Sequence, residues 1–285
     1  TINPEGLLER VITRVPNPVV GDMYSNNVYT NSREVGGVQI PRFHQHQDYD
    51  DGAHVPNVSG GDHAFGLETV SDLQTNVAAT LRVPNDVMSA RIQPVRVESQ
   101  RLGDGVWLIG GGSHNSVAVE FDDYITVVEA PVDERRNLAV IDEITRLLPN
   151  KPIRFLVNTH QHHDHIGGLR TYMHIGATII THWKNYDFYT RDVLNYSPRT
   201  LDPDMVSLWP PTELAEGYQY ETVRENYSLN NGERSMHMSY VHPLTHVEGM
   251  LIAYLPTERI LIEADLFDSS SAGVPVPTRV TPANR

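Results

Sequence analysis

The part of this sequence richest in chemically active side chains is the segment Asn158-Thr-His-Gln-His-His-Asp-His-Ile-Gly-Gly168, where four histidines and an aspartate occupy six positions. His160 and His162 lie two residues apart, so in an extended chain their side chains can reach one common point. Asp164 and His165 follow on the next turn and can reach a second point close by. The spacing therefore predicts that one turn of chain holds two metal ions.

Imidazole and carboxylate groups are the only strong metal ligands that this chain offers, because it contains no cysteine. Zinc and similar borderline cations accept both donors at about 2.0–2.2 Å, and three protein ligands leave one coordination position open to water. That open position makes a metal site catalytic, so the pattern predicts catalysis. Two other interpretations stand beside it: a histidine-rich loop in solvent, and a purely structural metal site. The closing glycines disfavour the structural site, since the ligands lie on one loop and do not clamp two elements together.

The neighbouring elements have to position these side chains. Ile153–Val157 is a continuous apolar run, typical of a buried strand, and the histidines begin where it ends. Gly167-Gly168 allows close packing as a helix begins, expected over about residues 164–174. Upstream, Asp133 is a plausible cap for a helix over residues 134–148. The apolar residues of that helix fall on one face: Leu138, Ile141, Ile144, Leu147 and Leu148.

The chain reads as two parts, a β-rich N-terminal extension with its linker at residues 1–93 and a larger domain at residues 94–285. In the first part we expect strands at 10–14, 27–29, 38–42 and 65–70, followed by a helical turn at 85–90. In the second part, further strands are expected at 95–99, 106–109, 116–121, 125–128, 177–180, 219–223, 235–241, 250–255 and 259–263. Strands alternating with helices predict an α/β fold, with catalytic groups on loops at strand ends.

Charge limits the partners of this chain. Its 22 basic and 36 acidic residues give a net charge of −14, and no run of basic residues occurs. A nucleic-acid backbone would be repelled, so we expect a small-molecule substrate and no nucleic-acid partner. No apolar run approaches the roughly 18 residues that a membrane span requires, so no membrane span is expected.

The segment Thr159-His-Gln-His-His-Asp-His165 resembles the signature motif of the metallo-β-lactamase superfamily. His246 is similar to that superfamily's third histidine, and Asp265, which ends an apolar run, is similar to its bridging aspartate. The resemblance covers about residues 95–285 and implies an αββα sandwich with two metal ions at one edge. It also implies the ligands: His160, His162 and His246 on the first ion, Asp164 and His165 on the second, and Asp265 between them.

Departures from the superfamily pattern refine this expectation. Aspartate at Asp265, where other branches have cysteine or serine, makes the site look more like the glyoxalase II and lactonase branches than the antibiotic-hydrolysing ones. His162 stands where flavodiiron proteins carry glutamate, which disfavours di-iron redox chemistry. Members normally continue with a helix and a strand that end in a histidine on the second metal. Only 20 residues follow Asp265, none of them histidine. The helix and strand are therefore missing from this sequence: either it is a fragment whose remainder is supplied elsewhere, or the second ion has only Asp164, His165, Asp265 and solvent. For this chain alone we expect the second ion to bind more weakly than the first.

The N-terminal part carries a second resemblance. Residues 14–23 and 36–41 look like the β-rich extension found ahead of some uncharacterised bacterial members of the superfamily. That resemblance implies export, so we expect a periplasmic or secreted protein, with a cytoplasmic location as the alternative.

Two further residues are candidates for substrate contact or for support of the ligands. His114, in the glycine-rich loop Gly110-Gly-Gly-Ser-His-Asn115, is expected near the metals, where substrate contact and ordinary hydrogen bonding are both open. Glu129 ends a predicted strand and either orients a ligand histidine or is a surface carboxylate.

Four other histidines are less directly implicated. His163, the variable position of the motif, is expected to point outward toward the mouth of the cleft. His182 is interpreted as a packed or supporting histidine in preference to a ligand. His44 and His46 have a spacing that would allow metal binding, but an exposed polar strand edge is the preferred interpretation.

Together these features predict a metallo-β-lactamase-fold hydrolase with two zinc ions, with iron or manganese as alternative metals. Metal-activated water would attack a small ester, lactone, thioester or amide, with β-lactams as a subset, and Asp164 would orient that water. One superfamily site supports many chemistries, so the substrate and the oligomeric state stay open. Two other functions are also open: a mononuclear iron oxygenase of the persulfide-oxidising type, and a binding module with a degenerate metal site.

Overall fold

The computed structural model describes residues 1–49, 65–78, 82–89, 94–210 and 217–266. The chain divides into two compact units, Thr1–Pro94 and Val95–Arg285, one residue beyond the expected boundary. We describe each unit by itself. No helix in the described ranges is long and apolar enough to cross a membrane.

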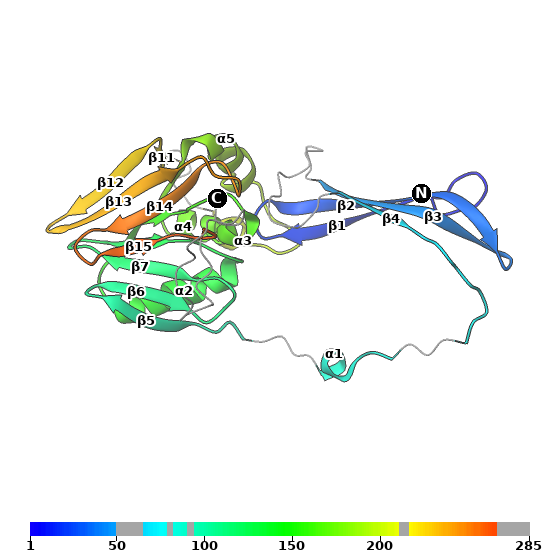
Figure 1. Cartoon of the computed structure of the whole chain (residues 1–285), viewed down its shortest axis with the longest axis horizontal. Coiled ribbons are helices and arrows are strands. Elements are labelled where there is room, and N and C mark those ends of the chain that lie inside the picture. Colours follow the sequence, from blue (N-terminus) through cyan, green and yellow to red (C-terminus); the bar gives the residue numbers. More distant parts are fainter. Residues whose placement is uncertain (50–64, 79–81, 90–93, 211–216, 267–285) are drawn as a thin grey trace. The chain divides into compact units, whose positions relative to one another are not determined.

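The first unit is a four-stranded antiparallel sheet in the order β1-β2-β3-β4 (Figure 1). Its strands are β1 (Arg10–Asn17), β2 (Gly21–Val35), β3 (Val38–Tyr49) and β4 (Phe65–Thr69), and a short helix, α1 (Asn85–Ser89), follows. Gly36 and Gly37 have positive φ angles of 59° and 80°, the left-handed backbone of a two-residue hairpin turn between β2 and β3. The strands at β2 and β3 are much longer than predicted, because backbone pairing continues through polar residues that carry no hydrophobic signal.

The second unit contains two sheets (Figure 1). The larger has seven strands in the order β11-β10-β9-β8-β7-β6-β5, and the smaller has four antiparallel strands in the order β12-β13-β14-β15. The larger sheet comprises β5 (Glu98–Gly103), β6 (Val106–Gly110), β7 (Ser116–Glu120), β8 (Ile125–Val128), β9 (Ile153–Val157), β10 (Thr178–His182) and β11 (Tyr220–Val223). The smaller comprises β12 (Asn226–Asn231), β13 (Arg234–Val241), β14 (Met250–Leu255) and β15 (Ile260–Ile262). Strands β8 to β11 pair in parallel.

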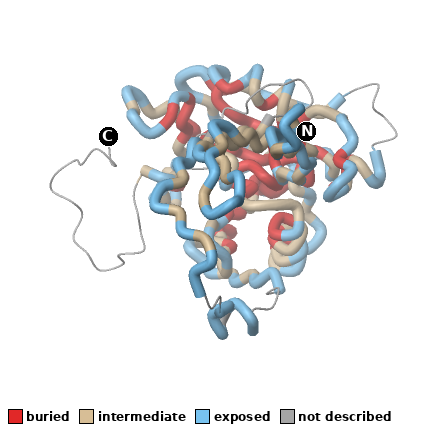
Figure 2. The backbone as a smooth tube through the Cα atoms, turned by 90° about the vertical axis from the view of Figure 1, so that its right-hand side faces the viewer, coloured by how far each residue is buried: buried red, intermediate tan, exposed pale blue. Residues whose placement is uncertain are grey.

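Apolar side chains from both sheets form the core between them. Figure 2 marks the buried residues of the chain in red. In the parallel strands, Val128, Val157 and Ile180 belong to this core. Their neighbours Val127 and Leu156 are equally buried and, because side chains alternate along a strand, face the opposite side of the sheet. The larger sheet is therefore covered on both faces, as parallel strands require.

Helices connect the strands of the larger sheet. They are α2 (Glu134–Leu147), α3 (His163–Ile166), α4 (Leu169–His174), α5 (Tyr186–Phe188) and α6 (Met205–Leu208), with a 3₁₀ turn at Trp183–Asn185 and a π-helical turn at Tyr189–Val193. Asp133 caps α2 as predicted, because its carboxylate accepts a hydrogen bond from the Arg136 backbone N–H at 2.8 Å. Among the described residues, no helix joins strands of the smaller sheet.

Three sequence expectations need correction here. The single helix expected over residues 164–174 is two short helices, α3 and α4, interrupted at Gly167 and Gly168. The strand expected at 95–99 is β5, which spans Glu98–Gly103. Strand β12 was not predicted, because only Tyr227 and Leu229 mark its inward face. The buried face of α2 is also different, formed by Arg136, Asn137, Val140 and Ile144.

Candidate metal centre

The histidine segment lies at the carboxyl edge of the parallel strands. Strand β8 ends just before Glu129 and β9 just before Asn158, and the two strands pair in register at Val128 and Val157. The carboxyl ends of adjacent parallel strands meet at one edge of the sheet, so the loops after β8 and β9 are neighbours. Catalytic groups are commonly placed at this edge in α/β folds.

Backbone hydrogen bonds hold these two loops together. The Val132 N–H donates to the Asp164 carbonyl and the Gly168 N–H to the Ala130 carbonyl, both at 2.9 Å. From the smaller sheet, the Leu251 N–H donates to the Thr159 carbonyl at 2.8 Å. The ligand-bearing segment is therefore fixed by both sheets.

The glycines of the motif are required by close packing. A Cβ at Gly167 would lie 2.0 Å from the Val132 carbonyl oxygen, and a Cβ at Gly168 would lie 2.0 Å from the Asn137 side chain. Any larger residue would push the histidine loop away from the loop after β8. The Gly167-Gly168 pair thus sets the position of the ligands as well as the break between α3 and α4.

Four of the predicted ligands form a first group. His160, His162, His246 and Asp265 each offer a ligand atom, and these atoms all lie within 4.8 Å of one another. Asp265 Oδ2 is 3.4 Å from His160 Nε2, 3.9 Å from His162 Nδ1 and 3.2 Å from His246 Nε2. These residues are separated by up to 105 positions in the chain, and the fold brings them to one point.

A second group contains His114, Asp164 and His165, again with ligand atoms within 4.8 Å of one another. Asp164 Oδ2 lies 3.0 Å from His114 Nε2 and 3.7 Å from His165 Nε2. His165 Nε2 is also 3.2 Å from Asp265 Oδ2, so Asp265 contacts both groups. This is the bridging position that the resemblance implied for it.

The donor atoms fit a metal ion better than they fit one another. Nε2 of His160 and Nε2 of His165 are shielded from solvent, and neither makes a hydrogen bond within the described residues. Ligands about 2.0–2.1 Å from a common tetrahedral centre lie about 3.3 Å apart, which is the spacing observed around Asp265. Imidazole and carboxylate donors without thiolate suit zinc, manganese or iron.

Glu129 supports the second group from behind. Its Oε2 lies 2.5 Å from His165 Nδ1, and its Oε1 accepts hydrogen bonds from the Thr159 N–H at 2.7 Å and from Asn158 Nδ2 at 3.1 Å. The glutamate is 5% exposed, so it is not the surface carboxylate that the sequence left open. Because Glu129 holds Nδ1 of His165, the other ring nitrogen, Nε2, faces Asp164 and Asp265.

The electrostatics of the cluster follow from burial and from these carboxylates. Burial lowers the pKa of His160 and of His246. Burial alone would also lower the pKa of His165, but the carboxylates of Asp265 and Glu129 raise it to about 10. The imidazoles of His160, His162 and His165 that surround Asp265 hold its pKa well below the ordinary value of an aspartate.

Two site residues have unusual backbone geometry. Glu129 and Asp265 have φ angles of 74° and 62°, in the left-handed region that non-glycine residues seldom adopt. Strain of this kind concentrates at functional sites, where the surrounding structure maintains it. Here it places one carboxylate behind His165 and the other between the two groups.

Two predicted candidates do not join the ligand groups. His163 was expected to point outward, but its ring lies over Phe188 with centroids 6.3 Å apart, and its Nε2 is shielded from solvent. His182 donates from Nε2 to the Arg224 carbonyl at 2.8 Å and stacks on Tyr240 at 4.0 Å, a packing role.

His44 and His46 of the first unit contact polar side chains of their own sheet. His44 Nε2 lies 2.8 Å from Asn27 Oδ1 and His44 Nδ1 lies 3.0 Å from Glu68 Oε2. His46 lies 3.2 Å from Asn27 Oδ1 and, through Nε2, 3.2 Å from Asp48. They form a partly exposed polar face on the sheet.

Sequence reasoning missed Arg136. Its guanidinium, 4% exposed, donates to the carbonyls of Arg96 at 2.6 Å, Gly110 at 2.9 Å and Ile109 at 3.2 Å, with a longer contact to the His114 carbonyl at 3.4 Å. This arginine therefore holds the loop that carries His114. The available signal was its position on α2, one turn before Val140 and two before Ile144 on the same face.

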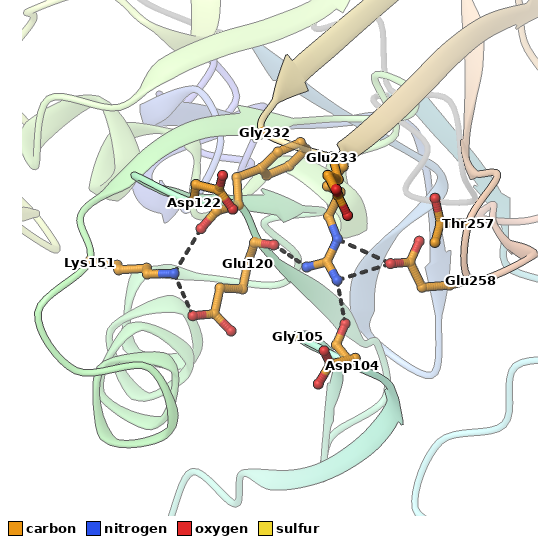
Figure 3. A pocket seen from close by; sticks show the side chains of 11 residues that line it. Asp104, Gly105, Glu120, Asp122, Lys151, Gly232, Glu233, Thr257 and Glu258 are labelled. Carbon is orange, nitrogen blue, oxygen red and sulfur yellow. Dashed lines mark hydrogen bonds and ion pairs between the residues drawn. The ribbon is translucent and has the colours of Figure 1, made fainter.

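A hollow of about 560 Å³ is lined by none of the ligand residues, and Figure 3 shows the side chains around it. Both of its cationic side chains are paired: Lys151 Nζ is 2.6 Å from Glu120, and Arg234 Nη2 is 2.9 Å from Glu258. Arg234 also donates to the Asp104 carbonyl at 2.6 Å, which joins the two sheets. We interpret this network as structural.

A family model described as the metallo-beta-lactamase superfamily matches residues 109–273, more than half of the chain and a span that includes every residue of both ligand groups. Similar solved structures include a metallo-beta-lactamase from Pontibacter korlensis, 15% identical over 62% of this chain and 75% of that chain, with a TM-score of 0.48. Another is the DIM-1 metallo-beta-lactamase, 14% identical over 62% of this chain and 73% of that chain, with a TM-score of 0.45.

No curated protein matches the chain. The family match confirms the fold class expected from the sequence, a metallo-β-lactamase fold preceded by a β-rich unit. The chain belongs to the metallo-β-lactamase superfamily, whose members are mostly metal-dependent hydrolases.

Proposed function

We propose that this protein is a hydrolase that uses two metal ions, preferably zinc, to cleave a small ester, lactone, thioester or amide. The observation that carries the proposal is the pair of ligand groups that share Asp265. Two adjacent ions held in this way suit an attack by water on a polarised carbonyl.

The ions would supply Lewis acidity and would lower the pKa of a bound water toward neutrality. Asp164 is suited to receive that water, because its side chain is 48% exposed whereas those of His160 and His165 are almost fully buried. Its carboxylate can orient the water and accept its proton. The imidazoles around it remain fixed by Glu129 and by Thr159, whose Oγ1 lies 2.9 Å from His160 Nδ1.

The surroundings favour a small, partly apolar substrate. A cavity of about 720 Å³ opens beside His165, His246 and Asp265, within the range typical of small-molecule sites. Its walls are mainly aliphatic and include Leu102, Leu108, Ile260 and Leu261. A net charge of −14 agrees with a small substrate and disfavours a polynucleotide.

The proposal is tested with the full chain, its measured metal content, and a panel of chromogenic ester, lactone, thioester and cephalosporin substrates. Asp164→Ala should lower kcat/KM by about 10²–10⁴-fold on whichever substrate is cleaved, because a positioned proton acceptor is lost. His160→Ala should lower the metal content and should reduce turnover to background. His237→Ala, at an exposed position on β13, is the matched control and should leave turnover unchanged.

Near-normal turnover in Asp164→Ala or His160→Ala would refute the assignment of the site. One iron and no zinc in the purified protein would favour the persulfide-oxidising oxygenase. A chain that binds no metal, yet binds a ligand equally well after His160→Ala, would favour the binding module.

A further inference from the structure

We propose that His114 is a protein ligand of the second metal ion, so that the site comprises His114, Asp164, His165 and the shared Asp265. This inference rests on the proposed metal-dependent function and names the group that completes its second site. It changes the expectation drawn from the sequence, in which the second ion had no histidine other than His165.

The distances support a ligand role for His114. Its Nε2 is 3.0 Å from Asp164 Oδ2, close to the roughly 3.3 Å that separates two ligands of one tetrahedral ion. Its ring meets the ring of His165 edge-on, with centroids 5.0 Å apart. His114 and His165 are the two histidines of the second group found among the described residues.

The other ring nitrogen of His114 is also accounted for. Nδ1 lies 2.9 Å from Ser113 Oγ, so a proton on Nδ1 can be donated to that hydroxyl. The lone pair of Nε2, which lies 3.0 Å from Asp164 Oδ2, is then available to an ion held between the two side chains. Metal-bound histidines commonly use their second nitrogen in this way, which fixes the tautomer and the ring orientation.

The loop that carries His114 is held in place. Arg136 donates to the carbonyls of Ile109 and Gly110 at its start and reaches the His114 carbonyl at its tip. Gly111 has a φ of 98°, and a Cβ there would lie 2.7 Å from the Arg96 carbonyl, so the turn requires glycine. A positioned loop is what a metal ligand requires, whereas an ordinary surface loop has no need of a buried guanidinium.

The ligand count points in the same direction. Catalytic zinc sites use three protein ligands and leave one position for water. Asp164, His165 and His114 supply three, with Asp265 shared between the ions. His242 lies 3.6 Å from Glu225 and stacks on Tyr240, and it is not a member of the group.

Calorimetric titration of the metal-stripped 285-residue chain with Zn²⁺ tests the inference. The wild-type chain should take up two ions. His114→Ala should weaken the second binding event by at least tenfold, because one of its ligands is removed, while the first event is unchanged. His242→Ala is the matched control and should retain both events.

A second variant places residue 114 on the ion directly. The chain has no cysteine, so His114→Cys introduces its single thiol. After titration with Co²⁺, this variant should show a thiolate-to-cobalt charge-transfer band that is absent from the wild type and from His242→Cys. The band requires a bond between residue 114 and the metal, and a merely structural role would not produce it.

The outcomes separate this inference from the proposed function. Two ions bound equally well by wild type and His114→Ala, with no charge-transfer band in His114→Cys, would refute the role of His114 and leave the hydrolase proposal in place. A wild-type chain that binds one ion and still cleaves substrate would contradict the inference and the count of two ions, and would leave the hydrolase assignment in place. A wild-type chain that binds none would contradict both.

Discussion

At the scale of single residues, the centre depends on groups that orient the ligands as much as on the ligands themselves. Glu129 has both oxygens committed, one to His165 Nδ1 at 2.5 Å and the other to the Thr159 N–H at 2.7 Å. The second contact is to the backbone of the histidine segment. One carboxylate therefore fixes the rotamer of a ligand and the path of the chain that carries the others.

Glu129→Gln should weaken the ion bound by His165 by about 10–100-fold. A glutamine side chain has one oxygen that can accept a hydrogen bond, and its NH₂ group can only donate. That NH₂ group would therefore face either the His165 ring nitrogen or the Thr159 N–H, and one of the two present hydrogen bonds would be lost. Calorimetric titration with Zn²⁺ measures the effect, and Glu221→Gln, at an exposed position on β11, is the control. Unchanged affinity for both ions would show that Glu129 has no orienting role.

At the scale of elements, features set by neighbouring residues could be predicted from the sequence, and contacts between distant segments could not. The apolar run of β9 and the cap and length of α2 were predicted correctly, because each depends on neighbouring residues. The predicted apolar face of α2 was only partly right: Ile144 is buried, but Arg136 also lies on the buried face and binds carbonyls that a helical pattern does not reveal. The motif residues from His160 to His165 were adjacent in sequence, but the proximity of His114 depends on a loop held by that same arginine.

The position of α4 depends on a buried ion pair at the start of α6. Asp204 caps α6, because its carboxylate accepts a hydrogen bond from the Ser207 N–H at 2.9 Å. The same carboxylate lies 3.0 Å from Arg170 Nη2 on α4 and 3.5 Å from Arg199 Nη1. It is 4% exposed. Burial would raise the pKa of Asp204, but hydrogen bonds from Arg170 and Ser207 lower it to about 2.

Asp204→Asn should lower the free energy of unfolding by about 3 kcal/mol at pH 7, because Arg170 loses its anionic partner. A carboxyl whose pKa is depressed by folding stabilises the protein above its unfolded pKa of about 3.9, and that stabilisation is lost as the pH falls toward 2. The difference between variant and wild type should therefore shrink below pH 4. Urea unfolding at several pH values measures it, with exposed Asp187→Asn as the control. A difference independent of pH would contradict the assigned ion pair.

At the scale of the whole molecule, metal binding should affect the stability of the two units differently. Both ligand groups lie within the second unit, Val95–Arg285. In the described part of the first unit, His44 and His46 have their ring nitrogens engaged with Asn27, Glu68 and Asp48. Anything that binds only the folded state raises its stability, so metal should stabilise the second unit and leave the first unchanged.

All three tryptophans, Trp107, Trp183 and Trp209, lie in the second unit, so tryptophan fluorescence reports the unfolding of that unit alone. Zinc at about 100 times its Kd should stabilise this unit by about 2.7 kcal/mol, which corresponds to a rise in Tm of about 5–10 °C, and a chelator should reverse the rise. His160→Ala should remove most of the shift, because the first group loses a ligand. Calorimetry of the same samples follows the first unit, whose transition should not move with zinc. A zinc-dependent shift there, abolished by His44→Ala, would instead make the polar face of the first sheet a metal site.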